Sequence, residues 1–223
     1  MSAISTNPTA GARLAGLDGL RALAIVLVLA YHLFPGLAPG GFIGVDIFLV
    51  VSGYLITALL IAEHRADGRI RLKRFWARRA RRLLPALVVV VAVTTTIAAV
   101  IGGDVLVGIG WQLAGALTFS SNWWSIANGS SYLDQTSPEL FRHFWSLAVE
   151  EQFYLLWPLA VIALLAVPLR HLRIALPLAI AVASAVAMAL LAGDPAVDPT
   201  PASAAYYSTL THGFGLLLGA GLA

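Results

Sequence analysis

The stretch "RRARRLLPALVVVVAVTTTIAAVI", residues 78–101, decides the class of this protein. Four arginines fall within its first five positions, and the nineteen residues from 83 to 101 carry no charge. A helix needs about 20 predominantly apolar residues to cross a bilayer. The stretch therefore predicts a membrane-spanning helix that starts at a cationic interface.

The composition of the whole chain points the same way. Of its 223 residues, 59% are hydrophobic and 11% are charged, whereas a soluble domain has about 25% charged residues. So few charges do not cover a globular surface, which argues against the alternative of a soluble all-helical core. We predict an all-α fold, a polytopic transmembrane helical bundle with about six to seven hydrophobic segments. These are 17–35, 42–61, 83–101, 104–124, 144–167, 174–191 and 206–223.

The distribution of charge predicts how the bundle sits in the membrane. Residues 63–82 contain nine lysines and arginines, and the positive-inside rule places this stretch in the cytoplasm. The polar residues 1–15 then form a disordered cytoplasmic tail, and 16–223 form the transmembrane domain. Because the last segment stops within an apolar run, we expect the N-terminal portion of a longer membrane protein.

One segment leaves two topologies open. If 104–124 crosses the membrane, the short basic motif "RHLR" at 170–173 lies outside. If 104–124 is re-entrant or interfacial, "RHLR" lies inside, as the positive-inside rule prefers. We favour the second arrangement.

The first segment carries three ionisable residues, which are costly within a membrane and mark functional hypotheses. Arg21 and His32 lie eleven residues apart, so they share one helix stripe about 16 Å apart along the axis. Asp18 is close enough to pair with Arg21. The alternatives are an interfacial ion pair at the helix start and a packing role for His32.

Asp46, in the second segment, is the predicted partner of His32. The two flank a hairpin turn at similar distances along the chain, so antiparallel packing predicts similar depths. A carboxylate beside an imidazole fixes its tautomer and makes it a better general base. Asp46 could instead pair with a basic residue or cap a broken helix. Ser52 is a weaker nucleophile candidate because it lies about two turns further in.

Two further groups complete the candidates. Arg78, Arg79 and Arg82 share helix faces at spacings of three and four, and guanidinium groups bind phosphates bidentately; anionic lipid would suit the same cluster. Glu150 shares a stripe with Ser146 and Tyr154, although an interfacial role for Glu150 and Glu151 is also open. The chain has no cysteine, and its other histidines, His64, His143, His171 and His212, show no metal-ligand spacing.

Four segments together resemble the membrane-bound acyltransferase 3 family, bacterial O-acyltransferases that modify surface polysaccharides, peptidoglycan, lipid-linked saccharides and some macrolides. They are "LDGLRALAIVLVLAYHLFP", "GGFIGVDIFLVVSGYLIT", "FWARRARRLLPAL" and "FRHFWSLAVEEQFYLLWP". A fifth, "YYSTLTHGFGLLLGAGLA", departs from the family pattern at His212 and Gly215, where members tend to have arginine and glutamate. Family members usually have about ten membrane helices.

The resemblance implies a reaction and roles. It implies transfer of an acyl group, most often acetyl, from cytoplasmic acyl-CoA to a hydroxyl of a carbohydrate or lipid-linked saccharide at a bacterial plasma membrane. His32 would be the general base, with Asp46, Glu150 and Arg21 also in the catalytic set. Arg79 and Arg82, with Arg78, would bind the donor. Lipid is the surrounding partner, and no metal or nucleic acid is expected. The alternative is a polytopic transporter or exporter of saccharide or lipid, whose intramembrane charges line a path.

Overall fold

The computed structural model describes residues 15–34, 36–132, 139–194 and 198–223. The predicted tail at 1–15 therefore lies outside the described residues except for Ala15. All regular elements within the described ranges are helical, which confirms the all-α prediction. They are α1 (Ala15–Leu33), α2 (Ile43–Asp67), α3 (Leu72–Ile101), the short 3-10 helix η1 (Gly103–Leu106), α4 (Ile109–Thr118), α5 (Ser121–Ala127), α6 (Phe144–Ala166), α7 (Arg170–Leu191), α8 (Pro199–Tyr207), α9 (Thr209–His212) and α10 (Phe214–Gly221).

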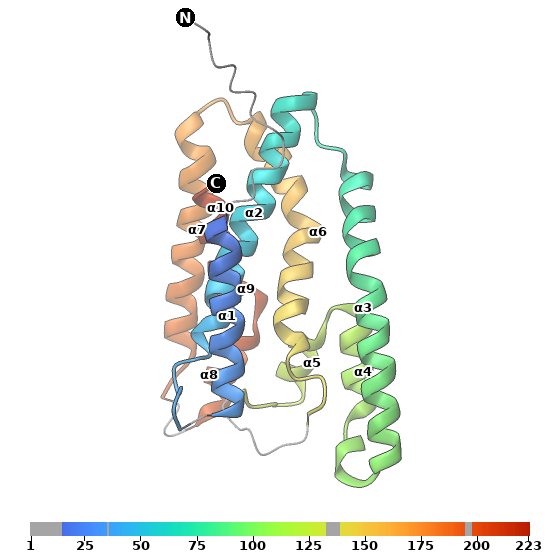
Figure 1. Ribbon diagram of the computed structural model, residues 1–223. Helices are drawn as coiled ribbons and strands as arrows, with labels where there is room; N and C mark the ends of the chain where they lie inside the picture. The colour runs from blue at the N-terminus through green and yellow to red at the C-terminus, as the bar shows by residue number, and fades with distance from the viewer. Residues whose placement is uncertain (1–14, 35, 133–138, 195–197) are drawn as a thin grey trace, which may run out of the picture.

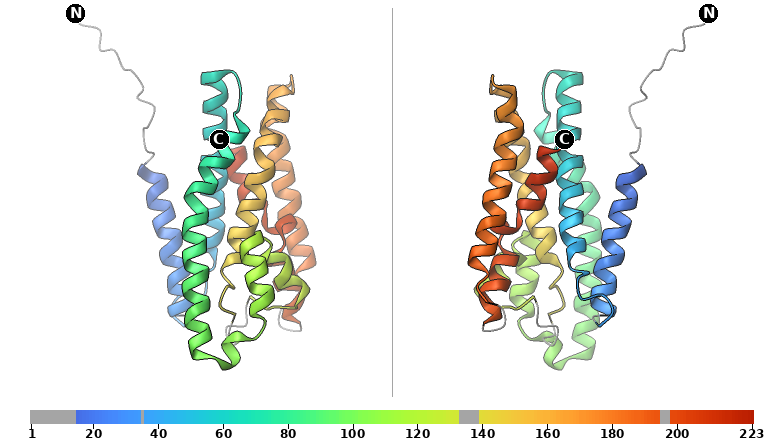
Figure 2. Two further views of the ribbon diagram at one scale, coloured as in Figure 1. Left: turned by 90° about the vertical axis from the view of Figure 1, so that its right-hand side faces the viewer. Right: turned by 90° about the vertical axis from the view of Figure 1, so that its left-hand side faces the viewer.

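Within the described residues, five helices are long and apolar enough to cross a membrane: α1, α2, α3, α6 and α7. They run roughly side by side along one axis (Figures 1 and 2). Large apolar side chains project outward from them, including Val93, which is 53% exposed, and Leu190, which is 78% exposed. An outer surface of this kind suits lipid and not water.

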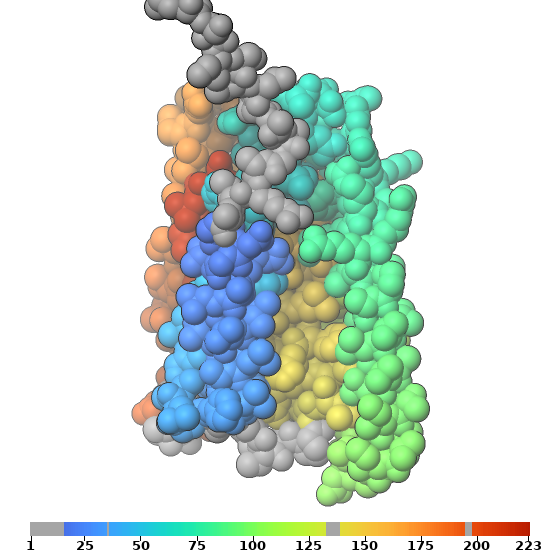
Figure 3. All heavy atoms as spheres, in the orientation of Figure 1, coloured from blue at the N-terminus to red at the C-terminus, as the bar shows by residue number. Residues whose placement is uncertain are grey.

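The two ends of the bundle differ in charge. The start of α1, the α2–α3 turn and the α6–α7 turn lie at one end (Figure 1). Because most of the basic residues of 63–82 and 170–173 are there, we call it the basic end. The α1–α2 turn and η1 lie at the opposite end. Figure 3 shows α6 at the floor of a recess between α1 and α3.

The structure decides between the two topologies for 104–124. This segment breaks into η1, α4 and α5, and α4, at 10 residues, is about 15 Å long. Phe119 joins α4 to α5 in the left-handed conformation, with φ of 52°, and the pair folds as a hairpin that enters from the opposite end (Figure 2). The segment is therefore re-entrant, and "RHLR" lies at the basic end.

Other boundaries differ from the predictions. The stretch 63–82 is mostly helix, because α2 continues to Asp67, where Gly68 caps it in the left-handed conformation, and α3 already starts at Leu72. Arginine is a good helix former, so the cationic cluster extends α3. The segment 206–223 is not one span but is divided among α8, α9 and α10. Six to seven predicted segments thus become five long helices and two broken ones.

Close backbone contact holds the last broken segment in place. Helix α10 packs against α2 and α7. A Cβ atom on Gly219 would overlap the carbonyl oxygen of Val50, and one on Gly53 would overlap the carbonyl of Leu216. Glycine at these two positions therefore permits α2 and α10 to touch backbone to backbone.

Candidate active site

His32 lies at the end of α1 opposite the basic end. Its Nδ1 is 2.8 Å from the carbonyl oxygen of Val28. Because a carbonyl only accepts, Nδ1 is the donor in this contact, and the neutral ring keeps its lone pair on Nε2. The backbone of α1 therefore fixes the tautomer of His32, a role that the sequence analysis predicted for Asp46. An imidazole held in this way can accept a proton at Nε2.

The immediate neighbours of His32 are rings. Its ring centroid lies 4.5 Å from that of His143 and 5.0 Å from that of Tyr31, both edge to face. His143 directly precedes α6, and burial, together with His32 and Arg142, lowers its pKa. The lowered pKa favours the neutral form of His143 beside the His32 ring. His143 shows no metal-ligand spacing along the chain, and its place before a span that begins at the same end was the signal for this contact.

Asp46 does not pair with His32: no hydrogen bond or ion pair joins them among the described residues. Instead, Asp46 Oδ1 lies 3.0 Å from His212 Nε2. The reason is the helical phase of α2. Gly44 and Phe48, four residues apart, face α1, and Asp46 lies two residues from each, about 200° round the helix. Its side chain therefore reaches the α9–α10 segment.

The pair of Asp46 and His212 is unusual in its hydrogen bonding. His212 is fully buried, and its ring lies 4.4 Å from that of Tyr206 and 5.0 Å from that of Trp145. Although the two atoms are 3.0 Å apart, neither His212 nitrogen nor Asp46 Oδ1 has a hydrogen-bond partner of good geometry in the described structure. This close but unaligned contact ties α2 to the broken C-terminal segment.

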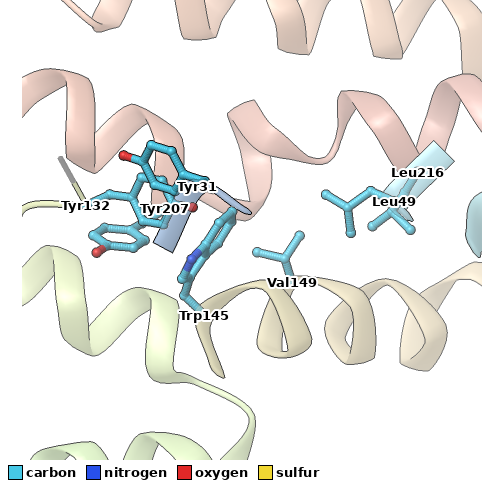
Figure 4. Packing of buried hydrophobic residues seen from close by; sticks show 7 residues of the cluster. All are labelled: Tyr31, Leu49, Tyr132, Trp145, Val149, Tyr207 and Leu216. Carbon is cyan, nitrogen blue, oxygen red and sulfur yellow. The ribbon is translucent and has the colours of Figure 1, made fainter. Parts of the chain in front are cut away.

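An aromatic cluster surrounds these histidines. Figure 4 shows Tyr31, Tyr132, Tyr207 and Trp145 gathered together, with Val149, Leu49 and Leu216 continuing the same core along the bundle. Tyr132 and Tyr206 stack with ring centroids 4.5 Å apart. Burial raises the pKa of Tyr132 to about 12, so its hydroxyl stays protonated at neutral pH.

Arg79 is engaged within the protein. Its Nε and Nη2 donate to the Glu151 carboxylate at 2.6–3.0 Å, and Nη2 is 3.8 Å from Glu150 Oε1. The guanidinium also lies 3.3 Å from the ring centroid of Tyr154, whose hydroxyl donates to Glu150 at 2.7 Å. The structure thus brings together Arg79 and Glu150, two predicted site residues, in one network with Glu151 and Tyr154.

The other predicted residues are separate from this network. Arg82 is exposed and makes no ion pair among the described residues, and Arg78 lies 3.9 Å from Glu63. Arg21 packs over the Phe48 ring at 5.2 Å. Of the alternatives for the start of α1, the ion pair of Arg21 with Asp18 does not form: Asp18 is exposed, and no ion pair joins the two in the described part of the chain.

A cavity of about 320 Å³ lies against the Arg79–Glu151 pair, between α3, the α4–α5 turn and α6. Apart from that pair and two neighbouring polar residues, Thr118 and Gln152, its lining is apolar and aromatic: Trp76, Ala80, Leu83, Leu84, Phe119, Tyr154 and Leu155. Gln152 donates to the carbonyl of Phe119 at 2.8 Å and so supports the turn of the re-entrant hairpin. No group of His, Asp and Glu side chains in the described ranges could hold a metal ion.

Comparison with known proteins gives relatives of one kind. The family described as "Acyltransferase domain" matches residues 14–223. The "Peptidoglycan O-acetyltransferase OatA" of Listeria monocytogenes is 42% identical over 93% of this chain and 33% of its own length. The "Putative peptidoglycan O-acetyltransferase YrhL" of Bacillus subtilis is 39% identical over 93% of this chain and 32% of its own length. No solved structure matches significantly.

The chain spans about a third of the length of these curated relatives. The match nevertheless covers nearly all of the chain itself, including His32, the α3 arginines and the α6 glutamates. The chain therefore belongs to the acyltransferase 3 family.

Proposed function

We propose that this chain is the membrane domain of an O-acyltransferase that moves an acetyl group from acyl-CoA to a hydroxyl of a cell-envelope carbohydrate. Peptidoglycan is the first candidate acceptor, because relatives that match 93% of the chain carry that name. The observation that carries the proposal is the tautomer of His32, whose Nδ1 is bound to Val28 and whose Nε2 is available as a base.

The chemistry follows from this nitrogen. Nε2 of His32 takes the proton of the acceptor hydroxyl as its oxygen attacks the thioester carbonyl carbon. The carbon–sulfur bond breaks, the new ester forms, and the thiolate of coenzyme A receives the proton from the imidazolium. General base catalysis of this kind contributes about 10² to 10⁴ in rate.

The donor and the acceptor meet the protein at different ends. By the positive-inside rule, the basic end and the start of α1 face the cytoplasmic side of a bacterial plasma membrane. Acyl-CoA is then bound by Arg78 and Arg82 on the exposed face of α3. Arg79 positions the site through Glu150 and Glu151 and lines the mostly apolar cavity that receives the acyl arm. His32, near the other end, faces the acceptor.

Asp46 and Arg21 take positioning roles in this scheme. Asp46 acts through His212, not through contact with His32, and holds α2 against the α9–α10 segment. Arg21 packs over Phe48 and holds α1 against α2. Both residues thereby set where the end of α1, and with it His32, lies.

The test is acetyl transfer from labelled acetyl-CoA to envelope glycans in membranes that contain the full-length protein. His32→Ala is compared with His171→Ala, a histidine on α7 that is exposed at the basic end. We expect loss of about 10² or more in the first variant and unchanged transfer in the second. Equal transfer by both variants, at matched amounts in the membrane, would remove His32 from the mechanism. Saccharide movement without any label would favour a transporter.

A further inference from the structure

Three polar side chains from three helices meet inside the bundle and bind one another in a closed cycle. Asn122 of α5 donates from Nδ2 to the hydroxyl oxygen of Thr209 in α9 at 2.9 Å. Thr209 donates in turn to Oε1 of Gln152 in α6 at 2.6 Å. Gln152 donates from Nε2 back to Oδ1 of Asn122 at 3.0 Å. Within the cycle, each side chain therefore gives one hydrogen bond and accepts one, all in the same direction.

The neighbours of the cycle fix this direction. Gln152 Nε2 also donates to the carbonyl of Phe119 at 2.8 Å, and Asn122 Nδ2 donates to the carbonyl of Tyr207 at 3.1 Å. Because a carbonyl only accepts, both contacts need the nitrogen of the amide and not its oxygen. The indole N–H of Trp123 donates to Gln152 Oε1 at 3.2 Å, which needs the oxygen there. The cycle cannot run the other way without losing these three bonds.

The surroundings of the cycle make its members depend on one another. Asn122 has none of its surface exposed, so a donor of this amide that loses its partner is left without water to replace it. In such a low-dielectric interior, hydrogen bonds in a closed network also strengthen each other. We therefore expect the cycle to act as a unit, in which the loss of one member weakens the remaining bonds.

The cycle joins the two broken segments, 104–124 and 206–223, to each other and to α6. On one side, Gln152 holds the carbonyl of Phe119, and both residues line the cavity between α3, the α4–α5 turn and α6. On the other side, Thr209 lies three residues before His212, whose ring contacts Asp46 of α2. A displacement of α9 therefore reaches the cavity wall through two hydrogen bonds, from Thr209 to Gln152 and from Gln152 to Phe119.

We propose that Asn122, Gln152 and Thr209 are positioning residues that couple the α9–α10 segment to the wall of this cavity. Hydrogen-bond networks carry such coupling between parts of a protein that do not touch. The three side chains act through Phe119 and His212 and not on the reacting atoms. The inference rests on the proposed function only in taking this cavity as the place of the acyl arm, and the coupling itself is measurable without acyl transfer.

The experiment measures hydrogen–deuterium exchange of the full-length protein in nanodiscs. Thr209→Val removes the hydroxyl and keeps the shape of the side chain, whereas Thr209→Ser keeps the hydroxyl. Thr96→Val is the matched control, because the Thr96 hydroxyl donates to the carbonyl of Ala92 within its own helix, α3. We expect Thr209→Val to raise amide exchange at least about tenfold both in α9 and at the α4–α5 turn. Thr209→Ser and Thr96→Val should leave the turn unchanged.

A second variant measures the coupling in the reverse direction. Gln152→Met keeps the length of the side chain but removes its donors, so exchange should rise in α9 as well as at the turn. Faster exchange confined to the element that carries the substitution, or equal exchange in Thr209→Val and Thr209→Ser, would overturn the proposal.

Acetyl transfer is measured in parallel on the same samples. Because the cavity wall is displaced, the KM for acetyl-CoA should rise in Thr209→Val and return to its original value in Thr209→Ser. A protein that is merely less stable would contain less active enzyme and show an unchanged KM. Absence of transfer by the unaltered protein would contradict the proposed function, while the exchange experiment still decides the coupling.

Discussion

At the scale of single residues, two charged side chains of the candidate site have partners within the protein: Asp46 lies against His212, and Arg79 donates to Glu151. His32 and Asp46 stand out because ionisable groups are rare in membrane segments, and Arg79 stands out as part of the arginine cluster at 78–82. The helical phase of a partner was not readable from the chain, because it depends on which face of α2 meets α1, and Asp46 consequently reaches His212. The resemblance implies that Arg79 binds the acyl-CoA donor. It could not reveal that the Arg79 guanidinium already donates to the Glu151 carboxylate.

The Arg79–Glu151 pair predicts a stability effect at this scale. Glu151→Gln leaves a partly buried guanidinium beside Glu150 alone, and removing one member of a buried pair costs about 3 kcal/mol. Asp67→Asn breaks an exposed i,i+4 pair with Arg71 and should cost about 1 kcal/mol or less. Thermal unfolding of the purified full-length variants measures the difference. Equal effects of the two changes would show that the pair contributes nothing beyond a surface contact.

At the scale of helices, apolar length predicted the five long spans, while the broken segments needed tertiary contacts. Segment 104–124 is long enough to span, but Phe119 adopts a left-handed turn that Gln152 supports from α6. Such a turn cannot be read from local sequence, because phenylalanine disfavours it. Segment 206–223 is broken at Ser208 and Gly213, where a serine cap starts α9 and a glycine starts α10.

The contact of α10 with α2 predicts how glycines will respond to substitution. Gly219→Ala places a methyl group on the carbonyl of Val50, so α10 must move away from α2. Gly19→Ala, in α1, meets open space and should be neutral or slightly stabilising, since alanine favours helix. We expect a lower unfolding temperature and reduced acetyl transfer for the first change only. If Gly219→Ala behaves like Gly19→Ala, the backbone contact does not hold the segment.

At the scale of the whole molecule, the re-entrant hairpin fixes which loops share a side of the membrane. The 223 residues contain no cysteine, so each introduced thiol is unique within them. Gly36→Cys and Val107→Cys should react with a membrane-impermeant maleimide in intact cells. Ala66→Cys and Leu172→Cys, at the basic end, should react only after permeabilisation. Labelling of Leu172→Cys in intact cells would mean that 104–124 crosses the membrane after all.

The length of α3 ties the protein to the thickness of its bilayer. Its 30 residues measure about 45 Å, whereas the hydrocarbon core is about 30 Å thick. The uncharged part from 83 to 101 fills that core, so Arg78–Arg82 lie at the level of the lipid headgroups. A thinner bilayer would tilt α3 or draw these arginines outward, and a thicker one would pull them toward the acyl chains. Hydrophobic mismatch, and with it the lipid composition of the cell, therefore sets the depth of these arginines, where the proposed donor would be bound.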